Sequence, residues 1–217
     1  MVTLLTADTA NGKKVELMLV EAGLAYEKKL VDLKSGEHES PWFLEISPAG
    51  KIPVLVDENG PGGEKISLSQ SLAIVKYIDS RCHPFGRMSE RDRAVQEQYL
   101  AFVASDVASA FSGLFMVGIL PGLQGRQVSA DAAQYFIAQA HRCLKLLDTR
   151  LTSSPFLTGH AYGLADVLAA PVLFYSCRML EEGVLNDYPA LRACGSVIAE
   201  RPAVKQVIDT AIIKSRT

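Results

Sequence analysis

The stretch of sequence that decides the fold is Ile46–Tyr77, which reads ISPAGKIPVLVDENGPGGEKISLSQSLAIVKY. Pro53 stands directly before the apolar run Val54–Val56. Because a proline inside a central strand removes a ladder hydrogen bond, Pro53 belongs at the start of a strand, where it is a candidate for a cis peptide bond. The helix that begins near Ser71 offers free N–H groups to an anion. Together these two features can hold an extended peptide with a carboxylate at one end.

The residues around this stretch predict an α/β domain. We expect the following elements, in order: a strand at Val2–Thr6, a helix from about Val15 to Gly23 after a break at Asn11-Gly12, a strand at Tyr26–Leu33, a short helix or turn at Pro41–Ile46 with Trp42 and Phe43 turned inward, strands at Pro53–Val56 and Lys65–Leu68, and a helix at Ser71–Ser80. Parallel pairing of the first two strands through the first helix makes a right-handed βαβ unit.

The second half of the chain shows helical periodicity and no convincing strand. We expect helix starts at Ser89 and Ser129, and further helices at Leu164–Glu181, Ala190–Glu200 and Pro202–Ile213. We therefore expect an α/β domain over residues 1–82, a linker over 83–88 and an all-α domain over 89–217.

Composition argues against several classes of protein. The net charge is −2 and the basic residues are scattered, which argues against nucleic-acid binding. No apolar run reaches the roughly 18 residues of a membrane span, and the N-terminus lacks the basic flank of a signal peptide. The four cysteines are widely spaced without a CxxC pair, which favours reduced thiols in a cytoplasmic protein over disulfides or a metal site.

Three groups of residues resemble the soluble glutathione transferase family. They are Ser47-Pro48 with Lys51–Leu55, Leu68–Ile74, and Phe156–Gly159 followed by Ala165-Asp166. The resemblance covers nearly the whole chain. It implies a thioredoxin-like N-terminal domain with a mixed four-stranded sheet, and a helical domain that supplies the pocket for the second substrate. It also implies glutathione as co-substrate, no metal, and a homodimer.

The same resemblance implies a role for each residue of the peptide cradle. The backbone of Ile52, before Pro53, would pair with the cysteinyl part of glutathione, while Gln70 and Ser71 would bind the γ-glutamyl carboxylate. Ser71 also fits an ordinary helix N-cap, and both roles can hold at once.

A glutathione enzyme must favour thiolate over thiol, which a hydroxyl or amide donor aimed at the sulfur can do. In the family this donor follows the first strand, where this chain has no Ser, Tyr or Cys. The segment Asp8–Lys14 instead resembles the bacterial nu class, with its Thr-x-Asn-Gly-x-Lys pattern, and Gly36-Glu37-His38 extends the likeness. The resemblance implies that Thr9 and Asn11 donate to the sulfur, although either could simply cap the first helix.

Lys51 and His38 are candidates for the glycine carboxylate of glutathione, and a charge-assisted bond from Lys51 is physically reasonable. Both also fit solvated loop residues. The resemblance implies that Asp106 contacts the γ-glutamyl amine of glutathione bound to the partner subunit. An ordinary acidic residue on the surface would account for Asp106 equally well. The small, apolar segment Val103–Val117 fits either an open substrate pocket or helix packing.

These features predict an enzyme that activates glutathione to reduce small disulfides or peroxides, to conjugate hydrophobic electrophiles, or both. Because no cysteine stands at the thiol site, reduction cannot run through a mixed disulfide on the enzyme there. The nu-class likeness favours reduction. The alternative is a non-catalytic binding or regulatory protein of the same fold, against which the intact Ile52-Pro53 and Gln70-Ser71 pairs count.

Overall fold

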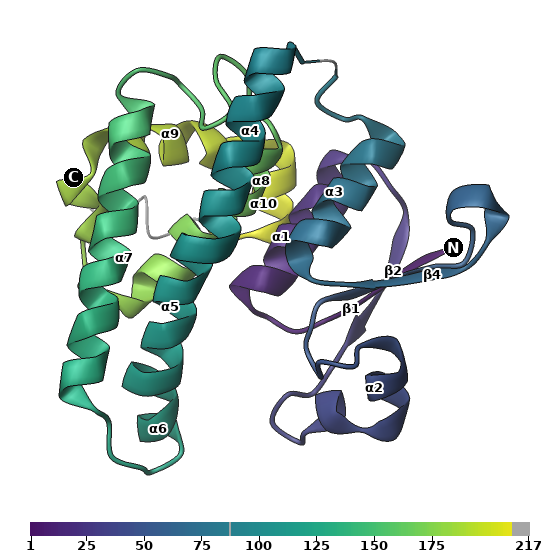
Figure 1. Cartoon of the computed structure of the whole chain (residues 1–217), viewed down its shortest axis with the longest axis horizontal. Helices are drawn as coiled ribbons and strands as arrows, with labels where there is room; N and C mark the ends of the chain where they lie inside the picture. Colours follow the sequence, from purple (N-terminus) through teal and green to yellow (C-terminus); the bar gives the residue numbers. More distant parts are fainter. Residues whose placement is uncertain (87, 210–217) are drawn as a thin grey trace. The chain divides into compact units, whose positions relative to one another are not determined.

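The computed structural model describes residues 1–86 and 88–209 (Figure 1). The chain divides after position 87 into two compact units, and Gln206–Ile208 count with the first one. Position 87 of the expected linker, and residues 210–217 of the expected helical domain, lie outside the described residues.

The first unit is built on a four-stranded mixed sheet with the strand order β2-β1-β3-β4. Its strands are β1 (Val2–Thr6), β2 (Tyr26–Leu30), β3 (Val54–Asp57) and β4 (Ile66–Ser69). As predicted, β1 pairs with β2 in parallel, while β3 runs antiparallel to both β1 and β4. The strand β2 ends at Leu30, three residues earlier than expected.

Helices cover both faces of the sheet. They are α1 (Ala10–Glu21) and α3 (Ser71–Cys82), which pack against each other on one face, and the short α2 (Pro41–Ile46) on the other (Figure 1). One-turn 3₁₀ helices lie at Glu37–Glu39 and Pro61–Gly63. Because both faces are covered, every residue of β1 and β3 is buried.

The core under α2 contains Phe43 together with Leu5, Val31, Val54 and Val56. Phe43 is fully buried, as predicted. Its neighbour Trp42 is 45% exposed, so the prediction that both aromatic rings turn inward is wrong. Consecutive helical residues point about 100° apart, and a single turn can therefore bury only one of the two rings.

The second unit is helical, and its described part contains no strand, as expected. Its helices are α4 (Glu90–Phe102), α5 (Ala108–Leu114), α6 (Leu120–Leu123), α7 (Ala130–Leu151), α8 (Leu164–Phe174), α9 (Pro189–Ala199) and α10 (Pro202–Val207). Two π-helical turns, Val103–Val107 and Phe115–Ile119, join α4, α5 and α6 into one helical segment. Short 3₁₀ helices lie at Ser176–Met179 and Val184–Asp187.

The predicted helix starts of this unit are confirmed. The hydroxyls of Ser89 and Ser129 accept hydrogen bonds from the N–H groups of Asp92 and Ala132, at 3.1 and 3.4 Å. The expected helix Leu164–Glu181 instead ends at Phe174. Pro171 contributes no N–H to its last turns, and a 3₁₀ turn follows. The last helix is described only to position 207; residues 210–213 of the expected helix lie outside the described residues.

Close packing of α5 on α7 explains the small residue at position 113. A Cβ atom on Gly113 would lie only 2.1 Å from Cε1 of Phe136 on α7. Val103, Val107 and Leu114 of the same segment are buried. For these positions the structure supports helix packing, the second of the two interpretations.

The helical stretch Glu90–Leu123 is long and apolar enough to cross a membrane, judged by length and composition alone. The core helices of soluble proteins meet the same criterion, and this stretch packs along α7 and α8 within its own unit. This finding is weak evidence for a membrane span.

Asp166 stabilises the start of α8. Its carboxylate accepts hydrogen bonds from the buried N–H groups of Leu157 (2.8 Å) and Gly163 (3.0 Å). Gly163 occupies the N-cap but has no side chain to return a bond, so only half of a capping box is formed. Burial raises the pKa of Asp166 to about 6, although both N–H donors lower it.

We expect Asp166→Ala to lower the free energy of unfolding by about 2–5 kcal/mol, because two buried N–H groups lose their acceptor. Urea denaturation followed by circular dichroism measures the change. The matched control is Asp131→Ala, which removes an exposed carboxylate from the first turn of α7 and should cost less than about 1 kcal/mol. Equal losses in the two variants would contradict the structural role of Asp166.

Candidate functional site

The strand register brings the sequence-predicted site residues of the first unit to one edge of the sheet. Leu5 of β1 lies opposite Val54 of β3, and Val54 lies opposite Ser69 of β4. Because β3 is antiparallel to both neighbours, the start of β3 meets the ends of β1 and β4 at this edge. The loop after β1, the Ile52–Pro53 bond and the start of α3 therefore emerge side by side.

The width of this edge fits a short extended peptide. Neighbouring strands lie about 4.8 Å apart, so three adjacent strands span about 10 Å. An extended peptide of three residues covers about the same distance. Such a ligand can contact all three segments at once, with its backbone beside β3 and its ends beside β1 and β4.

The loop after β1 leads directly into α1, which begins five residues earlier than expected. Thr9 is the N-cap, and its Oγ1 accepts a hydrogen bond of 3.1 Å from the N–H of Gly12. Gly12 is therefore not a break. A Cβ atom there would lie 2.3 Å from Oγ1 of Thr6 and 2.5 Å from the carbonyl oxygen of Ala7, so only glycine lets α1 start this close to β1.

Thr9 thus caps the helix, one of the two interpretations drawn from the sequence. Capping uses a lone pair of the hydroxyl oxygen and leaves its proton free to be donated. No hydrogen bond donated by Thr9 is found among the described residues. The side chain is half-buried at the ligand edge, so capping and binding to a sulfur are compatible.

Asn11, whose side chain is exposed at this edge, does not cap α1. Its Oδ1 accepts a hydrogen bond of 2.9 Å from Nζ of Lys14. Lys14 is only 2% exposed, and this burial lowers the pKa of its ammonium to about 8. Lys14 is the lysine of the Thr-x-Asn-Gly-x-Lys pattern, but the sequence alone assigned separate roles only to Thr9 and Asn11.

The segment before β3 has an unusual backbone. The Ile52–Pro53 peptide bond is cis, as predicted. Ile52 lies outside the strand register, and no hydrogen bond to its main chain is found within the described residues. The buried hydroxyl of Ser47 donates to the carbonyl oxygen of Lys51 at 2.9 Å and so anchors this loop. The Lys51 side chain is exposed.

The start of α3 shows that Ser71 is not the N-cap that the sequence allowed. The N-cap is Gln70 rather than Ser71, which is the first residue of the helix, and Gln70 makes no capping bond. Gln70 has a φ of 72°, a strained value for a residue other than glycine. The first N–H groups of α3 and the Ser71 hydroxyl are thus left to bind an anion.

His38 lies in the 3₁₀ turn that follows β2. Its Nε2 is 3.8 Å from Oε1 of Glu39, and its Nδ1 is buried without a hydrogen-bond partner among the described residues. The ring is half-buried rather than fully solvated. The strand β2 ends beside the end of β1, and His38 lies in the loop that the chain enters there.

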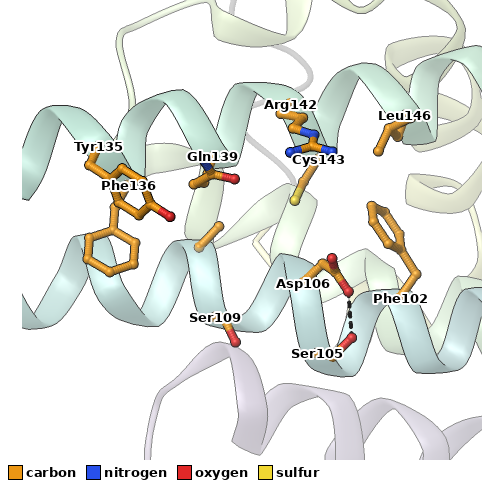
Figure 2. A pocket seen from close by; sticks show the side chains of 11 residues that line it. Phe102, Ser105, Asp106, Ser109, Tyr135, Phe136, Gln139, Arg142, Cys143 and Leu146 are labelled. Carbon is orange, nitrogen blue, oxygen red and sulfur yellow. Dashed lines mark hydrogen bonds between the residues drawn. The ribbon is translucent and has the colours of Figure 1, made fainter.

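Asp106 belongs to the second unit, where it lines a hollow of about 390 Å³ between the α4–α5 segment and α7 (Figure 2). Its carboxylate accepts a hydrogen bond of 2.6 Å from the hydroxyl of Ser105. Figure 2 shows Arg142, Gln139 and Tyr135 of α7 on the opposite wall. The hollow is partly polar, with Phe102 and Leu146 at one end.

A thiol or metal site within the described residues would consist of cysteine, histidine and carboxylate side chains. All four cysteines are free, and burial raises the pKa of the Cys177 and Cys194 thiols to about 12. Burial and the Asp106 carboxylate raise the pKa of Cys143 as well. No group of three metal-ligating side chains is found within residues 1–86 and 88–209.

Comparisons with known proteins agree with this architecture, a thioredoxin-like domain followed by a helical one. The family description "Glutathione S-transferase, N-terminal domain" matches residues 2–80, and the C-terminal domain of the same family matches residues 111–202. Disulfide-bond oxidoreductase YfcG of Escherichia coli is 33% identical over 96% of this chain and 94% of its own length. This chain therefore belongs to the glutathione S-transferase family.

Two solved structures are similar over nearly the full length. A glutathione transferase family member from Pseudomonas fluorescens, with two glutathione bound, has a TM-score of 0.84 and 27% identity, covering 96% of this chain and 93% of the other. A glutathione transferase from Pseudomonas putida, with one glutathione disulfide bound per subunit, has a TM-score of 0.85 and 25% identity. The match covers 100% of this chain and 92% of the other.

Lys14→Met should increase the free energy of unfolding at neutral pH by up to about 3 kcal/mol. The folded state lowers the pKa of Lys14 from near 10.5 to about 8, so the unfolded state binds more protons between these values. The cost of the buried ammonium is thus complete below about pH 8. It disappears as the pH rises through the unfolded pKa.

Denaturation of both proteins at neutral pH and at about pH 10 checks this expectation, since the difference should shrink at the higher pH. The control is Lys13→Met, which removes ion pairs of 3.6 Å to Asp8 and 3.3 Å to Glu16 and should give no gain. A Lys14→Met protein less stable than the wild type at neutral pH would count against an unfavourably buried charge.

Proposed function

We propose that this protein is a glutathione-dependent enzyme that binds glutathione across the edge formed by β1, β3 and β4. The main chain of Ile52 pairs with the cysteinyl part, and Gln70 and Ser71 bind the γ-glutamyl carboxylate at the start of α3. Lys51 and His38 bind the glycine carboxylate. The observation that carries the proposal is the register of β3, which supports placing these segments beside Thr9 and Asn11.

Thr9 and Asn11 activate the thiol. A hydroxyl proton from Thr9 and an amide N–H from Asn11 stabilise the thiolate but gain little from the neutral thiol, so the pKa of bound glutathione falls. The thiolate then attacks one sulfur of a small disulfide and releases the other half as a thiolate. A second glutathione attacks the mixed disulfide, so two glutathione and one disulfide give one glutathione disulfide and two thiols.

Reduction is the favoured reaction, with conjugation to hydrophobic electrophiles beside it. A relative that is 33% identical to this chain is named a disulfide-bond oxidoreductase. The two solved neighbours hold two glutathione molecules and one glutathione disulfide, the reactant and the product of such a cycle. Peroxides can react in the same site, where two glutathione and one hydroperoxide give glutathione disulfide, an alcohol and water.

We also propose a cytoplasmic homodimer with domains at 1–82 and 89–217, and no nucleic-acid or membrane partner. In this dimer Asp106 of one subunit contacts the γ-glutamyl amine of glutathione bound to the other. Family membership and the exposure of Asp106 support this arrangement.

Isothermal titration is expected to show binding of both glutathione and glutathione disulfide at millimolar concentrations or below. Coupled assays then separate the reactions: turnover with hydroxyethyl disulfide should exceed that with a chlorodinitrobenzene-type electrophile. Failure to bind either form of glutathione would favour the alternative, a non-catalytic member of the fold.

Two kinds of variant should separate thiol activation from ligand binding. Thr9→Ala and Asn11→Ala should each raise the pKa of bound glutathione with little loss of affinity, as read from thiolate absorbance. Thr9→Ser keeps the hydroxyl and is the matched control. Ser71→Ala should instead weaken binding several-fold and leave the thiol pKa nearly unchanged. Unaltered thiolate absorbance in both activating-site variants would show that the donor lies elsewhere.

A further inference from the structure

Lys14 is a buried cation with an unusual set of contacts. It lies on α1, and its Nζ donates to Oδ1 of Asn11 at 2.9 Å. Among the described residues, no carboxylate forms an ion pair with it. Its neighbour Lys13 differs, because it pairs with both Asp8 and Glu16.

This contact determines how the Asn11 amide is oriented. An ammonium group has donors only, so the atom that faces Lys14 must be the amide oxygen. The amide nitrogen, with its two N–H donors, is then turned away from Lys14. Without such a partner the terminal amide can rotate between two orientations of similar energy. In one of these it would present its oxygen to the ligand.

The orientation matters for a thiolate. An amide N–H stabilises a negatively charged sulfur, whereas an amide oxygen repels it. We propose that Lys14 is a positioning residue, which holds Asn11 with its N–H donors toward the sulfur of bound glutathione. This inference rests on the proposed function, and it gives the lysine of the Thr-x-Asn-Gly-x-Lys pattern a specific task of its own.

Stability does not account for a lysine at this position. A buried ammonium without a counter-charge is unfavourable, and an apolar side chain of similar length would pack there without that cost. A group that is unfavourable for folding, and that contacts a proposed ligand-binding side chain, is best explained by the site.

The test compares the wild type with Lys14→Met, which keeps the length of the side chain and removes its donors. The wild type is measured first, for glutathione affinity and for the pKa of the bound thiol. In Lys14→Met the pKa of the bound thiol should rise by about one unit. At a pH below both pKa values, this rise makes the thiolate fraction about tenfold smaller. Affinity should change less than about twofold, and the melting temperature should not fall. Lys13→Met should leave the thiol pKa unchanged.

A double-mutant cycle with Asn11→Ala tests whether Lys14 acts through Asn11. If it does, Lys14→Met should have little further effect on the thiol pKa once Asn11 is absent. Full additivity would overturn the inference, because Lys14 would then act on the sulfur independently. Lys14→Gln, which keeps a donor, is the second variant and should lose less thiolate stabilisation than Lys14→Met.

The outcomes distinguish this inference from the proposed function. A wild type that does not bind glutathione, or that does not lower its thiol pKa, contradicts the proposed function and this inference with it. A wild type that lowers the thiol pKa, combined with an unchanged thiol pKa in Lys14→Met, overturns only the role of Lys14. A lower melting temperature in that case would assign Lys14 to the fold alone.

Discussion

The register of β3 between its two antiparallel neighbours is the constraint on which the site depends. Leu5, Val54 and Ser69 lie in one row across the sheet, and this row places three loops at a single edge. A slip of one residue would turn the side chains of β3 to the opposite face and remove Val54 and Val56 from the core under α2. The packing that stabilises the sheet therefore also keeps the three segments of the proposed binding site together.

The two helices that begin at this edge start in different ways. The helix α1 is capped by Thr9 and held close to β1 by Gly12, so its start is well satisfied. The helix α3 follows a strained Gln70 and has no side-chain cap. Its N–H groups therefore stay available to an anionic ligand, and the protein tolerates local strain where binding is proposed. In the proposed site, the start of α1 donates hydrogen bonds to the glutathione sulfur, and the start of α3 binds the γ-glutamyl carboxylate.

The elements that sequence reasoning predicted well have strong local signals. The proline-started strand, the serine caps of α4 and α7, and the βαβ unit all follow from short-range chemistry. The errors arose where a distant contact overrides the local pattern. Asn11-Gly12 looked like a break because glycine usually marks one, but here glycine allows a close approach of α1 to β1. Trp42 looked like a core residue because it is apolar, yet the single turn of α2 points only Phe43 into the core.

The sequence by itself determined the order of the elements, the division into an α/β and a helical part, the cis proline and the residue types at the candidate site. These depend on backbone preferences and spacing, which are readable along the chain. Only the tertiary structure decided that Gln70 rather than Ser71 precedes α3, that Thr9 caps α1, and that Lys14 is buried against Asn11. Those facts depend on the backbone path into each helix and on how α1 packs within its unit, and neither is contained in a local sequence pattern.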